Sequence, residues 1–452
     1  MPAPVSMPGI GKIIKTPDYS KVKIVLALVG LPARGKSSLA KKLLRYLTWL
    51  EYKVKIFNVG ELRRKKASEE EQTQGIRGTN KPSSFDHTHT ETLHSAEKIA
   101  EESLENLISW MKSGGNIGIH DARNTNRARR ARITSRVSQE PGFKLVFLET
   151  ICEDPAIIEA NIALRASVED PDYNGLSQEE AFELYTQGIK QCEAVYETME
   201  PFEWEVMPEE NEGMSPEALE AERLRLVDAA EQSPGQNNPR VALVTKEMAK
   251  NVSYMKITDV GKQAKRSAFD FKHGECLYNV ENRIGGDVGL SRIGEAYARE
   301  LPSVIYNAVG DQPMTVWTSA LRRTIHTARH LPYPKMAWKA LDEIDAGVCD
   351  GMTYKEIEEA FPGDFAQRDR DKFNYRYSGG ESYRDVVARL EPVILQLERE
   401  KNILVIGHQA ILRCLYAYFH GNVTQDDLPY IKVPLHTIIK LTPTAYGCDE
   451  ER

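Results

Sequence analysis

A glycine-rich segment near the N-terminus constrains the fold of this chain more than any other feature. It covers residues 30–37 and follows the pattern G-x-x-x-x-G-K-S. An apolar run at 24–29 precedes it, and leucines at helical spacing follow between residues 39 and 47. A strand, a glycine loop and a helix in this order are typical of a phosphate-binding P-loop, whose backbone N–H groups surround the phosphates. The segment therefore predicts a nucleotide site at the end of a buried strand.

The residue types in and near this loop predict roles in binding ATP and Mg²⁺. We expect Lys36 to reach the outer phosphates and Ser37 to hold Mg²⁺. A second apolar run ends in Asp121, and a carboxylate placed so beside a P-loop holds the metal or accepts the substrate's hydroxyl proton. Lys36 and Asp121 are therefore catalytic candidates, and Ser37 and Asp121 are metal candidates. The predicted ATP-binding residues are Gly30, Leu31, Pro32, Ala33, Arg34, Gly35, Lys36, Ser37 and Ser38.

Length and composition narrow the class of protein. The chain has 452 residues, of which 41% are hydrophobic and 28% charged, as in a soluble globular protein with two or three domains. Its net charge of −7 argues against general nucleic-acid binding, and no apolar run reaches membrane-spanning length. The six cysteines lie far apart and form no C-x-x-C pair. They predict free thiols in a reducing compartment, which favours a cytoplasmic location.

Apolar runs and helical patterns alternate in two parts of the chain, which predicts α/β domains with mainly parallel sheets covered on both faces. We expect strands at 23–29, 53–58, 116–120, 144–149, 268–271, 315–318 and 403–406. We expect helices at 38–50, 91–112, 177–198, 291–307, 320–331, 354–361 and 382–400. The predicted segments are a flexible arm at 1–22, an α/β domain at 23–202, an acidic linker or insertion at 203–250, a short connector at 251–267 and a second α/β domain at 268–449. The polar stretch 65–90 fits a mobile loop over the nucleotide site or simple disorder.

Four arginines follow Asp121 closely, at positions 127, 129, 130 and 132. On a helix, 129 and 132 would share one face, and 127 and 130 another. They fit either a phosphate clamp or a solvated basic face, and the sequence leaves both open.

Two histidines end predicted strands of the second domain, His273 after 268–271 and His408 after 403–406. The carboxyl ends of parallel strands meet at one edge of a sheet, so the two rings can lie together. One can attack a phosphoryl group as neutral imidazole, and the other can stabilise the phosphorus centre as imidazolium. The pair predicts phosphoryl transfer.

The first domain resembles 6-phosphofructo-2-kinase in its P-loop, in segments 57–64, 149–152 and 171–173, and in Asp121 with Asn124 and the following arginines. The resemblance implies a P-loop kinase-like parallel sheet that uses ATP and Mg²⁺ to make fructose 2,6-bisphosphate from fructose 6-phosphate. By that resemblance Lys36 and Asp121 are catalytic, and Arg63 and Arg129 contact the sugar phosphate.

The sugar half of this kinase pattern is altered. Arg123 stands where the family has threonine, and Asp86 lies near the position of a family arginine that contacts the sugar phosphate. Gly188 and Cys192 align with a substrate-binding arginine and tyrosine. A family lysine has no exact equivalent, although Arg165 could replace it after a shift of one residue. Because charge-assisted phosphate contacts are lost, we expect weak kinase activity.

The second domain resembles the histidine-phosphatase (phosphoglycerate-mutase-like) superfamily and, more narrowly, fructose-2,6-bisphosphatase, through segments 283–287, 317–324, 342–349, 380–383 and 434–437. The resemblance implies an α/β domain without a cofactor, in which His273 is the phosphohistidine nucleophile and Glu343 the proton donor. His408 and Arg323 would stabilise the transferring group. The implied substrate-binding residues are Lys272, Asn279, Gly285, Arg323, Tyr354, Arg368, Lys372, Tyr383, Gln409 and Arg413. Lys272 replaces a family arginine, which keeps the charge but loses the bidentate fork.

Together the two halves resemble the bifunctional enzymes that set the level of fructose 2,6-bisphosphate. We expect hydrolysis to fructose 6-phosphate through a phosphohistidine to dominate over ATP-dependent synthesis. Two alternatives remain open: a catalytically silent, ATP-binding regulatory protein, and a histidine phosphatase for another sugar phosphate. The expected partners are small molecules, namely fructose 2,6-bisphosphate, fructose 6-phosphate and ATP, with no nucleic acid and no membrane. A homodimer is left open.

Overall fold

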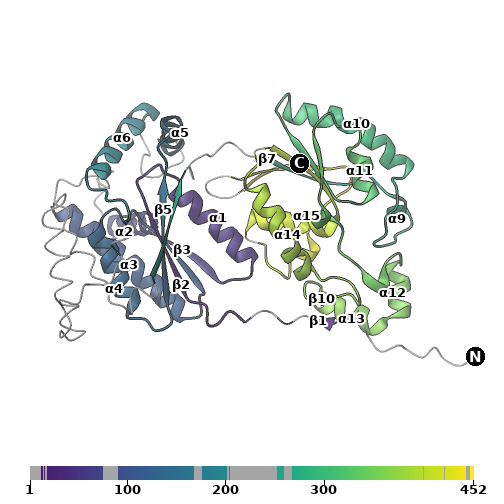
Figure 1. Cartoon of the computed structure of the whole chain (residues 1–452), viewed down its shortest axis with the longest axis horizontal. Helices are drawn as coiled ribbons and strands as arrows, with labels where there is room; N and C mark the ends of the chain where they lie inside the picture. The colour runs from purple at the N-terminus through teal and green to yellow at the C-terminus, as the bar shows by residue number, and fades with distance from the viewer. Residues whose placement is uncertain are drawn as a thin grey trace, which may run out of the picture. The chain divides into compact units, whose positions relative to one another are not determined.

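A computed structural model describes residues 12–13, 15, 18–74, 90–166, 176–200, 203, 252–258, 267–400, 402–421, 423–443 and 448–452. The chain divides into two compact units (Figure 1). The first, here called the P-loop unit, comprises residues 18–263. The second, here called the histidine unit, comprises residues 264–452 together with residues 1–17.

A five-stranded parallel sheet forms the centre of the P-loop unit, with the strand order β3-β4-β2-β5-β6. Its strands are β2 (Ile24–Val29), β3 (Val54–Asn58), β4 (Ile117–Asp121), β5 (Lys144–Ile151) and β6 (Val252–Thr258). The strand order reverses at β2, because the next strand in the chain, β3, lies beyond β4. Ligands of open parallel sheets bind beside such a reversal, at the carboxyl ends of the strands. The P-loop follows the carboxyl end of β2.

Alternation of side chains along β2 explains why helices cover both faces of this sheet. Val25 and Val29 pack into a cluster with α3 (Thr90–Lys112) and α4 (Arg127–Ser138). Leu26 and Leu28 point the other way, into a cluster with α1 (Lys36–Trp49). Figure 1 shows α1 on one side of the sheet and α3 with α4 on the other. Each buried side chain of this kind stabilises the fold by about 1.5–3 kcal/mol. The unit also contains α2 (Val59–Gln74), α5 (Pro155–Ala166) and α6 (Gln178–Ala194).

The histidine unit contains a six-stranded mixed sheet in the order β13-β12-β7-β11-β8-β9. The strands β7, β11, β8 and β9 run parallel, and β12 and β13 extend the sheet in antiparallel fashion. These strands are β7 (Ser267–Lys272), β8 (Thr315–Thr318), β9 (Lys335–Ala337), β11 (Asn402–Gly407), β12 (Ile438–Pro443) and β13 (Cys448–Glu451). The helices are α9 (Leu277–Val280), α10 (Arg292–Val309), α11 (Arg322–Ala328), α12 (Tyr354–Ala360), α13 (Pro362–Arg370), α14 (Tyr383–Leu397) and α15 (Gln409–His420).

The predicted α/β class is confirmed in both units, and every predicted strand lies within two residues of an observed one. Three segments differ from the prediction. The predicted connector at 251–267 contains β6, an edge strand of the first sheet. The predicted arm contains β1 (Lys12–Ile13), which pairs with β10 (Tyr375–Arg376). The polar stretch that begins at residue 65 continues α2 as far as Gln74, and α3 begins at Thr90.

Other predictions concern residues outside the described part of the chain. These are Asp86, segment 171–173 and the linker at 203–250 apart from Glu203. The remaining domain boundaries stay predictions. All six cysteines are free thiols, as predicted. In the described part of the chain, no helix combines the length and the apolar character needed to cross a bilayer.

Candidate functional site

The P-loop adopts a backbone that its two glycines make accessible. Gly30 has φ +137°, and a Cβ there would lie 2.7 Å from the backbone oxygen of Thr150. Gly35 has φ 84° and precedes the first turn of α1. Both conformations are unfavourable for side chains larger than hydrogen. The loop therefore places its backbone N–H groups at the N-terminus of α1, as a phosphate site requires.

Lys36 folds back over this loop. Its ammonium donates to the backbone oxygens of Gly30 and Leu31, at 2.7 and 2.6 Å. Burial lowers the pKa of Lys36 to about 7; Asp121 opposes this shift and Arg123 adds to it. Such a depressed pKa is typical of a functional site, because a bound phosphate would restore the charge.

Asp121 ends β4 and is buried, and its carboxylate accepts a 2.6 Å hydrogen bond from Asn58 Nδ2. Ser37 lies in the first turn of α1. A carboxylate and a hydroxyl beside a phosphate loop supply the oxygen ligands that Mg²⁺ prefers, with the remainder coming from phosphates and water. The residues present therefore fit Mg²⁺ together with a nucleotide.

On the predicted sugar side of this site, polar groups contact one another. Arg123 Nη1 donates to Cys192 Sγ at 3.3 Å, and burial raises the pKa of the Cys192 thiol. Gly188 is buried within α6 and carries no side chain for a sugar phosphate. Arg63 lies half-buried on α2. Arg129 donates to Glu97 Oε1 at 2.8 Å.

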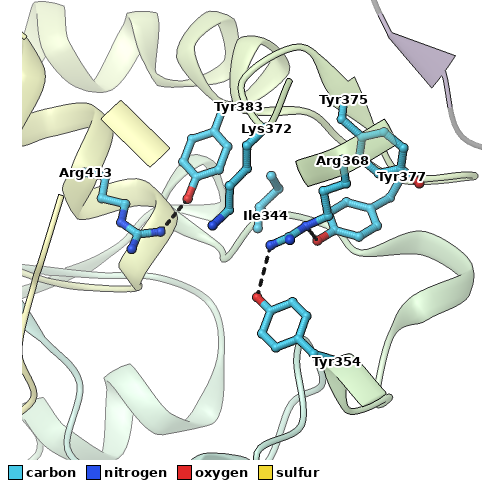
Figure 2. A pocket seen from close by; sticks show the side chains of 8 residues that line it. All are labelled: Ile344, Tyr354, Arg368, Lys372, Tyr375, Tyr377, Tyr383 and Arg413. Atoms are coloured by element: carbon cyan, nitrogen blue, oxygen red, sulfur yellow. Dashed lines mark hydrogen bonds between the residues drawn. The ribbon is translucent and has the colours of Figure 1, made fainter. Parts of the chain in front are cut away.

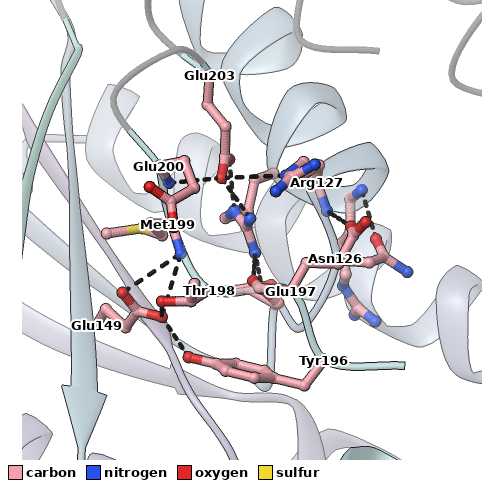
Figure 3. Close-up of polar contacts among 12 residues, drawn as sticks. Asn126, Arg127, Glu149, Tyr196, Glu197, Thr198, Met199, Glu200 and Glu203 are labelled. Atoms are coloured by element: carbon pink, nitrogen blue, oxygen red, sulfur yellow. Dashed lines mark hydrogen bonds and ion pairs between the residues drawn. The ribbon is translucent and has the colours of Figure 1, made fainter. Parts of the chain in front are cut away.

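The other arginines of this cluster contact carboxylates too. Arg130 makes a two-pronged pair with Glu203, at 2.7 and 2.8 Å, and both side chains are almost fully buried. Figure 3 shows Tyr196, Thr198 and Met199 beside Glu149, and Glu203 beside Arg127. The Glu149 carboxylate accepts hydrogen bonds from Tyr196 and Thr198. These contacts fix this stretch of the chain to the sheet, so they favour a structural reading of Arg130 over a phosphate clamp.

In the histidine unit, β7 and β11 lie side by side, and each leads into one of the two predicted histidines. Lys272 and Gly407 are register partners, and His273 N donates to the Gly407 oxygen at 3.1 Å. The rings of His273 and His408 follow at once, with centroids 5.2 Å apart. The predicted meeting of the two histidines at the carboxyl edge of the sheet is therefore confirmed.

His273 has the protonation state of a nucleophile. Burial, aided by Arg323, lowers its pKa to about 3. Its Nδ1 lies 2.7 Å from the backbone oxygen of Gly274 and must carry the ring's proton to make that hydrogen bond. Nε2 then keeps its lone pair, which is the electron pair needed to attack phosphorus.

The surroundings of His408 favour a neutral ring as well, which differs from the predicted imidazolium. Burial is the main cause of a pKa well below the usual 6.5, and Arg323 lowers it further. Arg323 Nε donates to His408 Nδ1 at 3.1 Å, so this nitrogen carries a lone pair. Because Arg323 brings the permanent charge, a second cation on His408 is unfavourable. The structure therefore favours a neutral His408, and the imidazolium at the phosphorus centre stays a prediction.

Glu343 and Lys272 approach the start of α15. Glu343 Oε1 accepts from the backbone N–H groups of Ile344 and Ala410, at 3.0 and 3.2 Å. Lys272 Nζ donates to Gln409 Oε1 at 2.6 Å. Burial lowers the pKa of Lys272, and the Glu343 carboxylate opposes that shift. A cation and a carboxylate thus lie at the edge of the sheet where the histidines meet.

Five predicted substrate-binding residues line one pocket (Figure 2). Its volume is about 60 Å³, several times the roughly 10–15 Å³ that one buried water needs. The pocket is lined by Ile344, Tyr354, Arg368, Lys372, Tyr375, Tyr377, Tyr383 and Arg413. Three of these side chains are cationic, so the pocket suits a phosphate. Burial, with Arg368 and Arg413 nearby, lowers the pKa of Lys372 to about 8.

The last two predicted residues, Asn279 and Gly285, shape the neighbouring loop. Asn279 Oδ1 accepts from Cys276 N at 3.0 Å and so caps α9. Gly285 has φ +72°, and a Cβ there would lie 1.7 Å from Asp350 Oδ1. The next residue, Gly286, accepts from Arg323 Nη1 at 2.6 Å through its backbone oxygen. Both residues therefore fix a loop that contacts the central arginine.

Sequence reasoning missed Tyr375 and Tyr377 in the pocket, and Ser319 against His408. Tyr377 OH accepts from Arg368 Nε at 2.8 Å. His408 Nε2 lies 2.8 Å from Ser319 Oγ. Ser319 follows the carboxyl end of β8, which neighbours β11. The same strand-end signal that identified the histidines could have found it.

Comparison with known proteins matches each part of the chain to a protein family. Residues 12–207 match the family model "6-phosphofructo-2-kinase", and residues 271–452 match "Histidine phosphatase superfamily (branch 1)". A relative from Saccharomyces cerevisiae named fructose-2,6-bisphosphatase is 40% identical over 94% of this chain and 87% of its own length. A relative from Gallus gallus named 6-phosphofructo-2-kinase/fructose-2,6-bisphosphatase is 39% identical, over 96% of this chain and 85% of its own.

Proposed function

Because the chain belongs to the 6-phosphofructo-2-kinase/fructose-2,6-bisphosphatase family, we propose that its main activity is hydrolysis of fructose 2,6-bisphosphate through a phosphohistidine on His273. The observation that carries this proposal is the state of the His273 ring. Its Nδ1 is held by the Gly274 oxygen, it is neutral, and Arg323 and Lys272 supply positive charge nearby. A neutral nucleophile among cations suits attack on a phosphate ester.

The reaction has two steps. His273 Nε2 attacks phosphorus, the bond to the sugar 2-oxygen breaks, and Glu343 gives that oxygen a proton. Water then attacks the phosphohistidine, Glu343 takes the proton of this water, and the nitrogen–phosphorus bond breaks. The products are fructose 6-phosphate and inorganic phosphate. Arg323 and Lys272 balance the charge that develops on the phosphoryl oxygens.

The cationic pocket supports a bisphosphate as the substrate. Arg368, Lys372 and Arg413 would hold the phosphate that does not react. Ile344 lines this pocket and directly follows the proposed proton donor Glu343, so the pocket adjoins the reacting centre. A histidine phosphatase for a sugar monophosphate would have no second phosphate for these three cations to bind. Relative turnover of mono- and bisphosphate esters tests this choice.

In the P-loop unit we propose that ATP and Mg²⁺ bind but that synthesis from fructose 6-phosphate is slow. When bound, Mg²⁺ neutralises charge on the outer phosphates. The part of the site predicted to bind fructose 6-phosphate supports weak kinase activity. There Arg123 contacts Cys192 and Arg129 contacts Glu97, at positions where the family pattern places substrate contacts. The name of the yeast relative, a bisphosphatase alone, agrees with this reading. The six free thiols support a cytoplasmic location.

Trapping the phosphoenzyme tests the main proposal. The full chain is mixed with fructose 2,6-bisphosphate labelled at the 2-phosphate and quenched within one turnover. The expected result is label that is stable to base and labile to acid, as for a phosphohistidine. No label on the protein, together with ATP binding, would favour the silent regulatory alternative.

A further inference from the structure

A chain of buried hydroxyl groups lies behind His408, on the side away from Arg323. Ser319, Thr324 and His408 all have zero exposed area. Ser319 Oγ lies 2.8 Å from His408 Nε2 and 2.8 Å from Thr324 Oγ1. Thr324 Oγ1 in turn donates to the backbone oxygen of Leu321 at 2.9 Å.

The donor of each hydrogen bond among Arg323, His408, Ser319 and Thr324 can be assigned. Arg323 Nε is always a donor, so His408 Nδ1 must accept. A neutral ring then carries its proton on Nε2, which donates to Ser319 Oγ. Ser319 Oγ also accepts from Leu321 N at 3.1 Å, so the Ser319 proton points to Thr324 Oγ1. Thr324 donates onward to Leu321 O.

We propose that Ser319 is a positioning residue, which fixes His408 as the Nε2-protonated neutral tautomer and thereby holds the Arg323 guanidinium in place for the phosphoryl group. This inference deepens the proposed bisphosphatase reaction and rests on it. Arg323 uses Nε for His408 and Nη1 for Gly286 O. Its Nη2 makes no hydrogen bond to any described residue, which leaves this nitrogen for phosphoryl oxygens.

The surroundings of His408 support a neutral ring. Arg323 on α11, Lys272 and His273 at the end of β7, and Arg389 on α14 all lower the pKa of His408, although Arg389 is itself paired with Glu381. Burial is the largest cause of the lowered pKa of His408, and the positive charges of Arg323, Lys272 and Arg389 add to it. The Glu343 carboxylate makes no hydrogen bond to the ring, and its Oε1 accepts the backbone N–H groups of Ile344 and Ala410. The ring therefore gains most from accepting the Arg323 hydrogen bond.

Removing the Ser319 hydroxyl leaves His408 Nε2–H buried without an acceptor. The ring would then favour protonation at Nδ1, which opposes the Arg323 donor. Ser319→Ala should lower kcat for fructose 2,6-bisphosphate by about tenfold to a hundredfold, with little change in KM. Ser319→Thr keeps a hydroxyl and should restore most of the loss. Thr134→Val, which removes a buried hydroxyl bonded to Arg130 O in the P-loop unit, is the matched control and should leave kcat unchanged.

The decisive test combines kinetics with ¹⁵N NMR of the histidine side chains in the full chain. In the wild type, the His408 signals should show a protonated Nε2 and an unprotonated Nδ1 from pH 5.5 to 8. In a double-mutant cycle, Ser319→Ala should have no further effect once His408 is alanine. A positively charged His408 across that range, or full kcat in Ser319→Ala, would overturn the inference. If Ser319→Ala fails to fold, the wild-type NMR result alone decides. Failure to form phosphoenzyme in the wild type would instead count against the proposed function.

Discussion

The arginines of the two candidate sites have different kinds of partners. In the P-loop unit, Arg129 and Arg130 contact the carboxylates Glu97 and Glu203, which neutralise their charge. In the histidine unit, Arg413 Nη1 donates to the neutral hydroxyl of Tyr383 at 2.8 Å.

Two further arginines of the candidate site behave in the same way, whereas arginines elsewhere in the histidine unit, such as Arg376 and Arg389, pair with carboxylates. Arg368 donates to the hydroxyls of Tyr377 and Tyr354, although Nη1 also contacts Asp369 at the surface. Arg323 donates to neutral His408. A hydroxyl orients a guanidinium without cancelling its charge, whereas a carboxylate does both. The sequence shows one basic cluster, at residues 127–132, whereas Arg368, Lys372 and Arg413 come together only in the fold, where they keep their charge for a ligand.

The largest expected effect concerns the nucleophile. His273→Ala should abolish phosphoenzyme formation and bisphosphatase turnover, because the neighbouring His408 uses both ring nitrogens in hydrogen bonds to Arg323 and Ser319 and has no free lone pair for phosphorus. His330→Ala, which removes an exposed histidine of the same unit, is the control. Quenched single-turnover labelling of both variants makes the comparison. Labelled His273→Ala protein would show that another residue carries the phosphoryl group.

Breaking the buried Arg130–Glu203 ion pair of the P-loop unit should lower stability but leave bisphosphatase activity unchanged. Glu203→Gln leaves Arg130 buried without its counter-charge, so the free energy of unfolding should fall by about 3–5 kcal/mol. Glu101→Gln is the control, because Glu101 is exposed and lies 3.9 Å from Arg132; its effect should stay below about 1 kcal/mol. Urea unfolding measures both. Equal stability of the two variants would contradict a structural role for Arg130.

Substitutions of Lys272 test how the shape of the positive charge affects the reacting centre. Its ammonium is a point charge, whereas a guanidinium can hold two phosphoryl oxygens at once. Lys272→Ala should reduce the rate of phosphoenzyme formation by more than about tenfold, and Lys272→Arg should raise it above that of the wild type. Rapid-quench labelling gives these rates. A slower Lys272→Arg variant would mean that the hydrogen bond from Lys272 to Gln409 contributes more to the rate than a two-pronged guanidinium contact would.

The smallest effect is a pH dependence of substrate binding. The pKa of Lys372 is lowered to about 8, so its ammonium is present at pH 7 and mostly lost by pH 9. Losing one charge-assisted contact should raise KM by about tenfold over that interval. Lys372→Arg keeps its charge and should show a much smaller rise. Equal pH dependence in both proteins would assign the change to another group.

Much of the fold could be predicted from the sequence because the central strands are fully buried and apolar, as in β2 and β11. The edge strand β6 was missed because only alternate residues, such as Val252 and Tyr254, face inward. The two-residue strand β1 is exposed and has no hydrophobic pattern. Most of α2 is charged on every side, so it resembled a polar loop.

Two kinds of site residue were predictable from the sequence. His273 and His408 were predictable because they follow the carboxyl ends of buried strands, and the substrate-binding residues were predictable from the resemblance to the family. The charge state of His408 was not, because it depends on burial and on Arg323, 85 positions away in the chain. The partners of Arg129 and Arg130 lie 32 and 73 positions away, at Glu97 and Glu203. No local spacing could have distinguished a phosphate clamp from a structural ion pair.

The most direct test of the contrast between the units is to measure both reactions on one preparation of the full chain. Bisphosphatase turnover is followed as fructose 6-phosphate release, and kinase turnover as formation of fructose 2,6-bisphosphate from ATP and fructose 6-phosphate with Mg²⁺. The expected result is a kcat/KM for hydrolysis that clearly exceeds the kcat/KM for synthesis with respect to fructose 6-phosphate. Brisk synthesis at low micromolar fructose 6-phosphate, with hydrolysis slow or absent, would contradict it.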